Sequence, residues 1–233
     1  MDVLLDGIAE AIRLLVTGDE DTWGITALTL RVSLTATLLA LVLGVPAGAA
    51  LALGEFRGRR TLLAAANTGM GLPPVIVGLF VTVLLWRNGP LGALGLLYTP
   101  TAMVIAQAVI STPIVVALTA AALQQVDPEF LDQMRALGAT KSRALLALLN
   151  EARLPLLAAG MAAFGAVVSE VGAAQMVGGN LAGETRVLTT AAVLATSQGE
   201  FALAIAFGIV LLVIAFSVNF VVTLAQQRQL VPR

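Results

Sequence analysis

Two ionisable side chains lie inside long apolar stretches of this sequence. Glu170 follows Ser169 in AVVSEVGAAQMV, and Arg31 lies in TALTLRVSLTATLL. An ionised group at the centre of a bilayer costs roughly 2.5 to 3.5 kcal/mol on insertion scales, so each needs a partner or a function. We expect Glu170, with Ser169, to be hydrogen-bonded at a gate or subunit contact, because a carboxylate repels anions. Arg31 has the sign that attracts an anion, although its guanidinium could instead extend to the lipid headgroups.

Polar and bent segments accompany these two residues. The segment GLPPVIVGL places Pro73 and Pro74 in an apolar stretch, where proline removes a backbone donor and kinks a helix. Such kinks are tolerated where neighbouring helices or a water-filled cavity satisfy the backbone. We expect this helix to line a pore near Asn67; a packing kink without a substrate role is the alternative. Hydroxyl and amide donors follow in a predicted outer loop, at Asn180, Thr185, Thr189 and Thr190.

Covalent and metal chemistry has few residues to use. The 233 residues include no His and no Cys, which excludes disulfides, thiolate or imidazole metal sites and histidine acid–base catalysis. The sequence lacks a G-x-x-x-x-G-K-[ST] loop that could hold nucleotide phosphates, and no cluster pairs a nucleophile with a base. We therefore expect no catalytic residue, metal site or cofactor in this chain.

The composition predicts an all-α integral membrane protein. Hydrophobic residues make up 58% and charged residues 12% of the chain, and the mean hydropathy is +0.95. A spanning helix needs about 20 apolar residues. Suitable runs predict five spans, at 26–53, 62–86, 101–123, 156–177 and 202–225. Residues 187–198 are too short to cross, and we expect a short helix there on the outer side of the last span.

Basic residues predict the orientation, since cytoplasmic loops carry the excess of Lys and Arg. One side holds Arg57, Arg59, Arg60, Arg135, Lys141, Arg143, Arg153, Arg228 and Arg233. The other side holds Arg13, Arg87 and Arg186. The N-terminus should therefore lie outside and the C-terminus in the cytoplasm. A net charge of −1 gives no basic surface for nucleic acid.

Residues 1–20 should form a unit separate from the transmembrane domain at 21–228. Apolar residues at helical spacing share one face of this segment: Leu4, Leu5, Ile8, Ile12 and Leu15. Acidic residues line the other face, which predicts an amphipathic helix lying on the outer membrane surface. A frayed, solvated tail is the alternative.

Residues 127–155 form the one substantial charged amphipathic segment among the spans. Asp127 can cap a helix that has Pro128 at its first position and Glu129 in its first turn. Gly138 interrupts the helical pattern, and either a bend or a close backbone approach would explain a glycine there. We expect Pro155 to lie at the start of the fourth span.

This segment resembles the cytoplasmic loop of permease subunits of ATP-binding-cassette (ABC) importers, which carries an E-A-A-x-x-x-G motif. DQMRALG, from Asp132 to Gly138, matches that frame with the acid conservatively changed and both alanines replaced, and Ala139 and Thr140 extend the match. The Leu154-Pro155 pair lies four residues farther from Gly138 than is usual in the family. The segments VVSEVGAAQMVGGN and GETRVLTTAAVL are similar to the molybdate and tungstate branch and look closest to tungstate permeases.

The resemblance implies a type I ABC importer permease that moves a tetrahedral oxyanion, most specifically tungstate, through the inner membrane of a prokaryote. It implies a coupling helix in region 127–150 that contacts the ATPase through Asp132, Ala136, Leu137, Gly138, Ala139 and Thr140. It further implies a homodimer in the lipid bilayer, two cytoplasmic ATPase subunits that bind ATP and Mg²⁺, and an extracytoplasmic oxyanion-binding protein.

Other functions compete with this expectation. Molybdate, sulfate or phosphate could replace tungstate as the substrate. An ATP-independent secondary transporter should carry more ionisable residues in its spans or a repeated half, and only Arg31 and Glu170 lie in the predicted spans. An intramembrane enzyme would need a cluster of reactive side chains that the sequence does not display.

Overall fold

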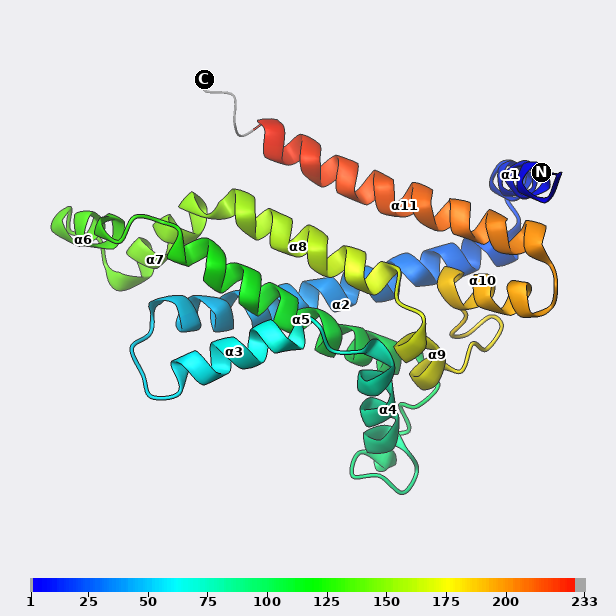
Figure 1. Cartoon of the computed structure of the whole chain (residues 1–233), viewed down its shortest axis with the longest axis horizontal. Coiled ribbons are helices and arrows are strands. Elements are labelled where there is room, and N and C mark those ends of the chain that lie inside the picture. The colour runs from blue at the N-terminus through cyan, green and yellow to red at the C-terminus, as the bar shows by residue number, and fades with distance from the viewer. Residues whose placement is uncertain (1, 229–233) are drawn as a thin grey trace.

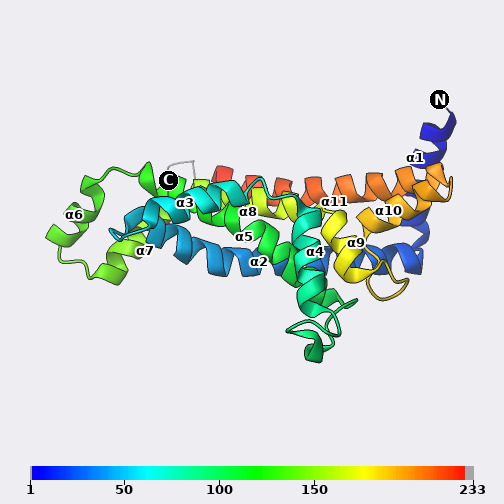
Figure 2. The same ribbon diagram turned by 60° about the horizontal axis from the view of Figure 1, so that its bottom comes forward.

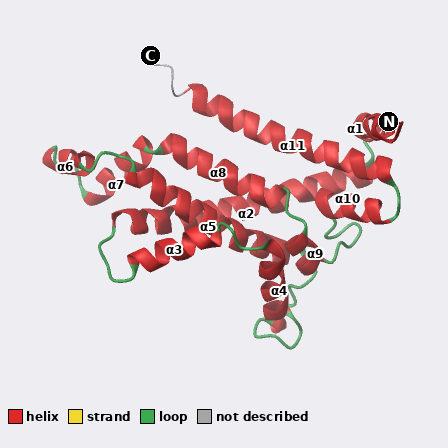
Figure 3. Cartoon of the chain, in the orientation of Figure 1, coloured by secondary structure: helices red, strands yellow, loops and turns green. Residues whose placement is uncertain are grey.

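The computed structural model describes residues 2–228, and every regular element in that range is helical (Figure 3). In chain order the elements are α1 (Asp2–Thr17), α2 (Glu20–Leu53), α3 (Arg59–Gly69), α4 (Pro74–Leu85), η1 (Gly92–Leu94), α5 (Pro100–Gln124), α6 (Glu129–Ala136), α7 (Lys141–Glu151), α8 (Arg153–Val168), α9 (Gly172–Gly178), α10 (Leu188–Ser197) and α11 (Phe201–Arg228). The predicted all-α class is confirmed.

Four helices, α2, α5, α8 and α11, run along the long axis of the molecule (Figure 1). The pair α6 and α7 lies at one end of this bundle, and α1 and α10 lie at the opposite end (Figures 1 and 2). Helix α4 is turned across the long axis and projects from the side of the bundle. We refer to these ends as the α6–α7 end and the α1–α10 end.

The helices allow up to five membrane crossings. By length and composition, α2, α5 and α11 can each span a bilayer. Two bent pairs qualify as joint spans, α3 with α4 at 104° and α7 with α8 at 68°. The predicted number of spans therefore agrees with the structure when each bent pair is one span. The bounds differ for the fourth span, because the second pair runs from Lys141 to Val168 and the prediction was 156–177.

The predicted second span, 62–86, is two helices rather than one kinked helix. Helix α3 ends at Gly69, α4 begins at Pro74, and Pro73 between them is extended at φ −63° and ψ 120°. A proline pushes the preceding residue out of the α region, so Pro74 keeps Pro73 extended. Pro74 itself suits a first helical position, where no N–H is needed. The proline pair therefore separates two helices.

The predicted fourth span, 156–177, is also divided. Helix α8 ends at Val168 and α9 begins at Gly172. The short helix predicted at 187–198 is confirmed as α10, whose Leu188 and Ala191 pack with Phe207 and Val210 of α11.

Small residues bring α2 and α5 close together. A Cβ added to Gly44 would lie 2.7 Å from Val115 Cβ, and one added to Gly48 would lie 2.7 Å from Thr119 Cβ. Two glycines four residues apart share one helix face, the small-xxx-small pattern by which membrane helices approach closely. The α2–α5 pair is thus a tightly packed centre on which the other helices lie.

Helix α1 is formed as predicted and has two apolar faces. Gly7, Ala11 and Leu14 are buried, and the latter two pack around Ala206 of α11. The apolar residues predicted to face the membrane remain largely exposed, with Leu4 at 59% and Ile12 at 59%. The helix is therefore docked on α11, which contradicts a frayed tail, and its second apolar face is uncovered.

Candidate functional site

Helix α6 begins with the cap that the sequence predicts. Asp127 Oδ1 accepts a hydrogen bond from the Glu129 N–H at 2.9 Å, and the Asp127 carbonyl accepts one from the Phe130 N–H at 3.0 Å. Pro128 between them is helical, with φ −53° and ψ −33°. These bonds satisfy donors that a helix start leaves unpaired, so the predicted role of Asp127 is confirmed.

Gly138 ends α6 in a left-handed turn. Its φ is +82°, its N–H donates to Arg135 O at 2.9 Å, and the Ala139 N–H donates to Met134 O at 3.0 Å. These two bonds define a Schellman C-cap. Thr140 Oγ1 then accepts the Arg143 N–H at 3.4 Å and starts α7. A bend and a close backbone approach were the two explanations for this glycine, and the left-handed turn supports the bend.

Gly138 has open space around it in the described part of the chain. Among residues 2–228, a Cβ added there would meet no atom within 4 Å. Leu137 beside it is 79% exposed. The other predicted coupling residues lie on α6 or in the turn that follows it. Asp132, Ala136 and Thr140 are exposed, as is Gly138 itself, and Ala139 is half-buried.

The opposite face of α6 attaches to the bundle. Phe130 and Leu131 pack against a buried cluster formed by Ala49 of α2, Ala122 and Leu123 of α5, Leu148 of α7 and Ala152 at the α7–α8 junction. Close-packed side chains transmit displacement because few voids can absorb it. Phe130 and Leu131 thus attach α6 to a cluster that α2, α5 and α7 share.

The two helix breaks lie next to each other because α4 packs on α9. A Cβ added to Gly78 would lie 2.7 Å from Ala173 Cα, and one added to Gly172 would lie 2.5 Å from Val75 Cγ2. Val75 follows Pro73 and Pro74, and Gly172 follows the α8–α9 break. Figure 1 shows both breaks on the same side of the bundle.

Glu170 lies in the α8–α9 break and is 6% exposed. Its Oε1 accepts the Ala173 N–H at 2.8 Å and its Oε2 accepts the Ala174 N–H at 2.9 Å. Its carbonyl oxygen accepts a hydrogen bond from Thr189 Oγ1 at 2.9 Å. The partner of this carboxylate is therefore the first turn of α9, while Ser169 is exposed and donates to Gly165 O of its own helix at 2.8 Å.

The hydroxyl groups of Thr185, Thr189 and Thr190 donate their protons to backbone oxygens of the protein. Thr185 donates to Gly178 O at 2.6 Å, Thr189 to Glu170 O, and Thr190 to Val187 O at 3.0 Å. All three side chains are buried, and a hydroxyl has one proton to donate. In this structure none of them has a proton free for an anion. Asn180 Oδ1 accepts from Arg186 Nε at 3.3 Å.

A polar cavity of about 870 Å³ lies at the α1–α10 end, between α1, the start of α2, loop 181–186, α10 and the start of α11. Three arginines line it: Arg13, Arg31 and Arg186. Six carboxyl side chains also line it: Glu10, Asp19, Glu20, Asp21, Glu184 and Glu200. Arg31 is exposed and belongs to neither of the two ion pairs in residues 2–228. The sequence predicted Arg31 as a candidate but gave no sign of the surrounding acids.

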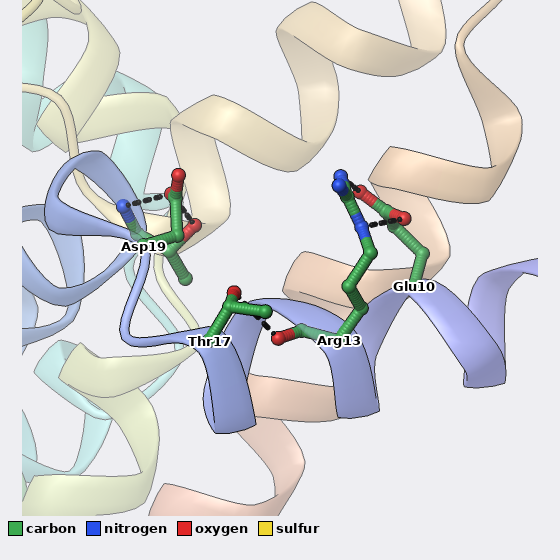
Figure 4. A network of polar contacts seen from close by, with 5 residues as sticks. Glu10, Arg13, Thr17 and Asp19 are labelled. Carbon is green, nitrogen blue, oxygen red and sulfur yellow. Dashed lines mark hydrogen bonds and ion pairs between the residues drawn. The ribbon is translucent and has the colours of Figure 1, made fainter.

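Hydrogen bonds lower the pKa of two acids of this cavity, Glu10 and Asp19 (Figure 4). Arg13 Nε donates to Glu10 Oε2 at 2.8 Å, and this bond lowers the pKa of Glu10 and raises the pKa of Arg13. Thr22 donates to Asp19 Oδ2 through its hydroxyl at 2.6 Å and its N–H at 2.9 Å, which lowers the pKa of Asp19. Both carboxyls therefore keep their charge to a lower pH than a carboxyl without such bonds, and the cavity is lined by six carboxyl side chains and three arginines.

The predicted site residues thus fall in three places. Pro73, Pro74, Ser169 and Glu170 lie at the two adjacent breaks, and exposed Asn67 lies on α3 before the first break. Arg31 lines the cavity at the α1–α10 end. The coupling residues lie at the opposite end of the bundle.

Residues 40–231 match the family described as binding-protein-dependent transport system inner membrane component. The tungstate uptake system permease protein TupB of Peptoclostridium acidaminophilum is 38% identical over 97% of this chain and 100% of its own length. TupB of Campylobacter jejuni is 35% identical over 95% of this chain and 92% of its own. The molybdenum transport system permease protein ModB of Escherichia coli K12 is 30% identical over 72% of this chain and 77% of its own.

The fold is also shared with a solved structure. A chain of the MetNI methionine ABC transporter, in an inward-facing conformation, superposes with a TM-score of 0.72 at 19% identity, covering 93% of this chain and 97% of that one. The predicted type I ABC importer permease fold is confirmed. The family match and the 38% identity to TupB over 97% of this chain show that it belongs to the binding-protein-dependent transport system inner membrane components, the permease subunits of ABC importers.

Proposed function

We propose that this chain is the membrane subunit of an ATP-driven importer for a tetrahedral oxyanion, with tungstate as its first substrate and molybdate as its second. The observation that carries the proposal is the full-length similarity to TupB, at 38% identity over 97% of the chain, against 30% over 72% for ModB.

The α6–α7 turn is the proposed docking surface for the ATPase. It combines an exposed outer face around Leu137 and Gly138 with an inner face, Phe130 and Leu131, packed against the ends of the bundle helices. The sequence has no phosphate-binding loop of its own, so ATP and Mg²⁺ bind to the partner ATPase. Two copies of the chain present two such turns to two ATPase subunits.

The proposed motion starts at these turns. Closure of the ATPases on ATP displaces α6, and the cluster around Leu123 and Leu148 passes the displacement to α5 and α7. A pore between the two copies then turns outward, and hydrolysis resets it. Each state needs its own helix packing, stabilised by the ligand that favours it.

The proposed gate lies at the adjacent helix breaks. Pro73 and Pro74 separate α3 from α4, and Ser169 and Glu170 separate α8 from α9. Such non-helical backbone within a membrane is tolerated where it lines a cavity or is buried in protein. Asn67, exposed on α3, offers a polar side chain on the same path.

The proposed orientation places the α6–α7 end in the cytoplasm and the α1–α10 end outside, in the inner membrane of a prokaryote. The exposed leucines and isoleucines of α1 then lie in the outer membrane interface. An extracytoplasmic binding protein delivers the anion at this end, where Arg31 attracts it.

Reconstitution tests the proposal. The chain is placed in proteoliposomes with its ATPase and binding protein, and uptake of labelled tungstate, molybdate and sulfate is compared with and without ATP. We expect ATP-dependent uptake with tungstate preferred over molybdate and sulfate excluded. Flux that persists without the ATPase would support a secondary transporter, and a preference for molybdate would reverse the substrate order.

A further inference from the structure

An apolar groove of about 620 Å³ runs along the bundle between α2, α8 and α11. Its walls include Leu34, Leu38 and Leu41 of α2, Gly160 of α8 and Val218 of α11. The groove is unrelated to the helix breaks and to the polar cavity at the α1–α10 end, because none of its lining residues belongs to either.

The groove has the length of one membrane leaflet. Leu34 and Val45 mark its ends on α2, and roughly 17 Å of helix separates them at 1.5 Å per residue. Half of a bilayer core is about 15 Å thick. An acyl chain lying along the groove would therefore fit within a single leaflet.

One end of the groove is polar and positively charged. Arg153, the first residue of α8, lines it together with Asn150 of α7, at the α6–α7 end of the bundle. Arg153 is exposed and takes part in neither ion pair of the described residues 2–228. The other lining residues are predominantly aliphatic or aromatic, so charge is confined to the end where a headgroup would lie.

The lining of the groove favours a lipid chain as its occupant. The walls are apolar over the length of one leaflet, and the one charged lining residue, the exposed Arg153, lies at one end. This pattern matches an apolar tail that ends in an anionic headgroup.

We propose that this groove binds one acyl chain of an anionic phospholipid, whose phosphate is held by Arg153 in the leaflet on the α6–α7 side. Lipid tails are as apolar as the leucines that line the groove, so the tail supplies packing rather than a hydrophobic driving force. Selectivity comes from the headgroup, because a guanidinium pairs well with a phosphate. The bound lipid would lie against Leu149 and Asn150, near the end of α7.

Gly160 offers a matched pair of variants. A Cβ added there would lie 3.6 and 3.7 Å from the two Cδ atoms of Leu41, an ordinary contact distance. Gly160→Ala therefore fits without occupying the groove, whereas Gly160→Phe fills it. Leu38→Trp fills the groove from the facing helix and serves if Gly160→Phe does not fold. Arg153→Gln removes the charge and leaves the walls intact.

The measurement is native mass spectrometry of the purified full-length permease in its native oligomer, after exchange into detergent with equal amounts of phosphatidylglycerol and phosphatidylcholine. We expect about fivefold retention of phosphatidylglycerol over phosphatidylcholine, the effect of one basic residue on an anionic lipid. Arg153→Gln should remove this preference, Gly160→Phe or Leu38→Trp should remove retention of both lipids, and Gly160→Ala should change nothing.

Equal retention of the two lipids by the unmodified protein would overturn the proposal. So would an anionic preference that survives Arg153→Gln, or full retention in both groove-filling variants. Because the chain has no native cysteine, Leu157→Cys also tests the competing occupant, and a disulfide between two copies at this groove position would assign the groove to a second copy. Lipid retention is measured without transport, so its failure is distinguishable from failure of the proposed import function.

Discussion

Replacing Glu170 by leucine tests how the buried carboxylate holds the α8–α9 break. The side chain is 6% exposed and accepts the N–H groups of Ala173 and Ala174 at 2.8 and 2.9 Å. Leucine is similar in size to glutamate but leaves both N–H groups without an acceptor. A buried unsatisfied donor costs about 1 to 3 kcal/mol, and relief from burying a charge offsets part of the total. We expect a net loss of about 3 kcal/mol in the free energy of unfolding.

This loss should appear as a lower melting temperature. One kcal/mol corresponds to about 2 to 4 °C for a chain of this size, so Glu170→Leu should lower Tm by roughly 6 to 12 °C. Glu170→Gln keeps one oxygen but turns an NH2 group toward the second N–H, and we expect about half that shift. Ser169→Ala is the control, because the Ser169 hydroxyl is exposed and bonded only to Gly165 O.

The assay is thermal unfolding of the purified chain in detergent, followed by tryptophan fluorescence and by recovery of the native oligomer. A Glu170→Leu protein that unfolds at the same temperature as Ser169→Ala, with full recovery of the oligomer, would refute the reasoning. That result would mean that the two amides of α9 find water or another acceptor without cost.

Three further predictions concern other parts of the chain. Gly138→Val should abolish ATPase retention and anion-stimulated ATP hydrolysis without preventing insertion, since a β-branched residue is strained at φ +82°. Asparagine tolerates that conformation, so Gly138→Asn should retain more of both. Normal coupling in the Val variant would contradict the docking role. Gly48→Leu should destabilise the α2–α5 pair and lower Tm, because its Cβ alone would lie 2.7 Å from Thr119 Cβ; an unchanged Tm would show that the helices separate freely. An impermeant thiol reagent on intact cells should label Ala182→Cys and spare Lys141→Cys, and the reverse pattern would invert the orientation.

The α6–α7 region could be predicted from sequence because its determinants are local. A cap acts within about four residues, so Asp127 before Pro128 could be predicted as a cap, and the structure contains it. The cap that Thr140 gives to α7 was not predicted, although it is equally local. The sequence could not decide whether Gly138 serves a turn or a close backbone approach. That decision depends on which segments lie next to the glycine in the folded chain.

The α8–α9 break was missed, and the α3–α4 break was predicted only as a kink at Pro73 and Pro74, because hydropathy registers neither break. Residues 62–86 and 156–177 stay apolar through each break, so a window of about 20 residues reads each as one span. Stronger local signals were present. Pro73 precedes another proline and is disfavoured in the α region, and Glu170 lies three residues before an N–H that its carboxylate can accept, as at a helix start.

The polar cavity at the α1–α10 end had no local signal in the sequence. Its acids come from α1, the start of α2, loop 181–186 and the start of α11, and only the folded chain brings them together. The same holds for the threonines of the predicted outer loop. Their sequence suggests free hydroxyls, and their hydrogen bonds to Gly178 O, Glu170 O and Val187 O become visible only in the packed structure.

These two features bear on where the anion is selected. An oxyanion that enters this cavity meets six carboxyl side chains and three arginines, and the hydrogen bonds to Glu10 and Asp19 lower the pKa of those two acids. Exposed charges interact over about 8 Å at physiological ionic strength, so the attraction of Arg31 competes with repulsion from acids in the same cavity. The nearby threonines cannot compensate, since their protons are already donated. In the described structure the cavity therefore presents more acidic than basic side chains, and the hydroxyl protons of Thr185, Thr189 and Thr190 are already donated within the protein.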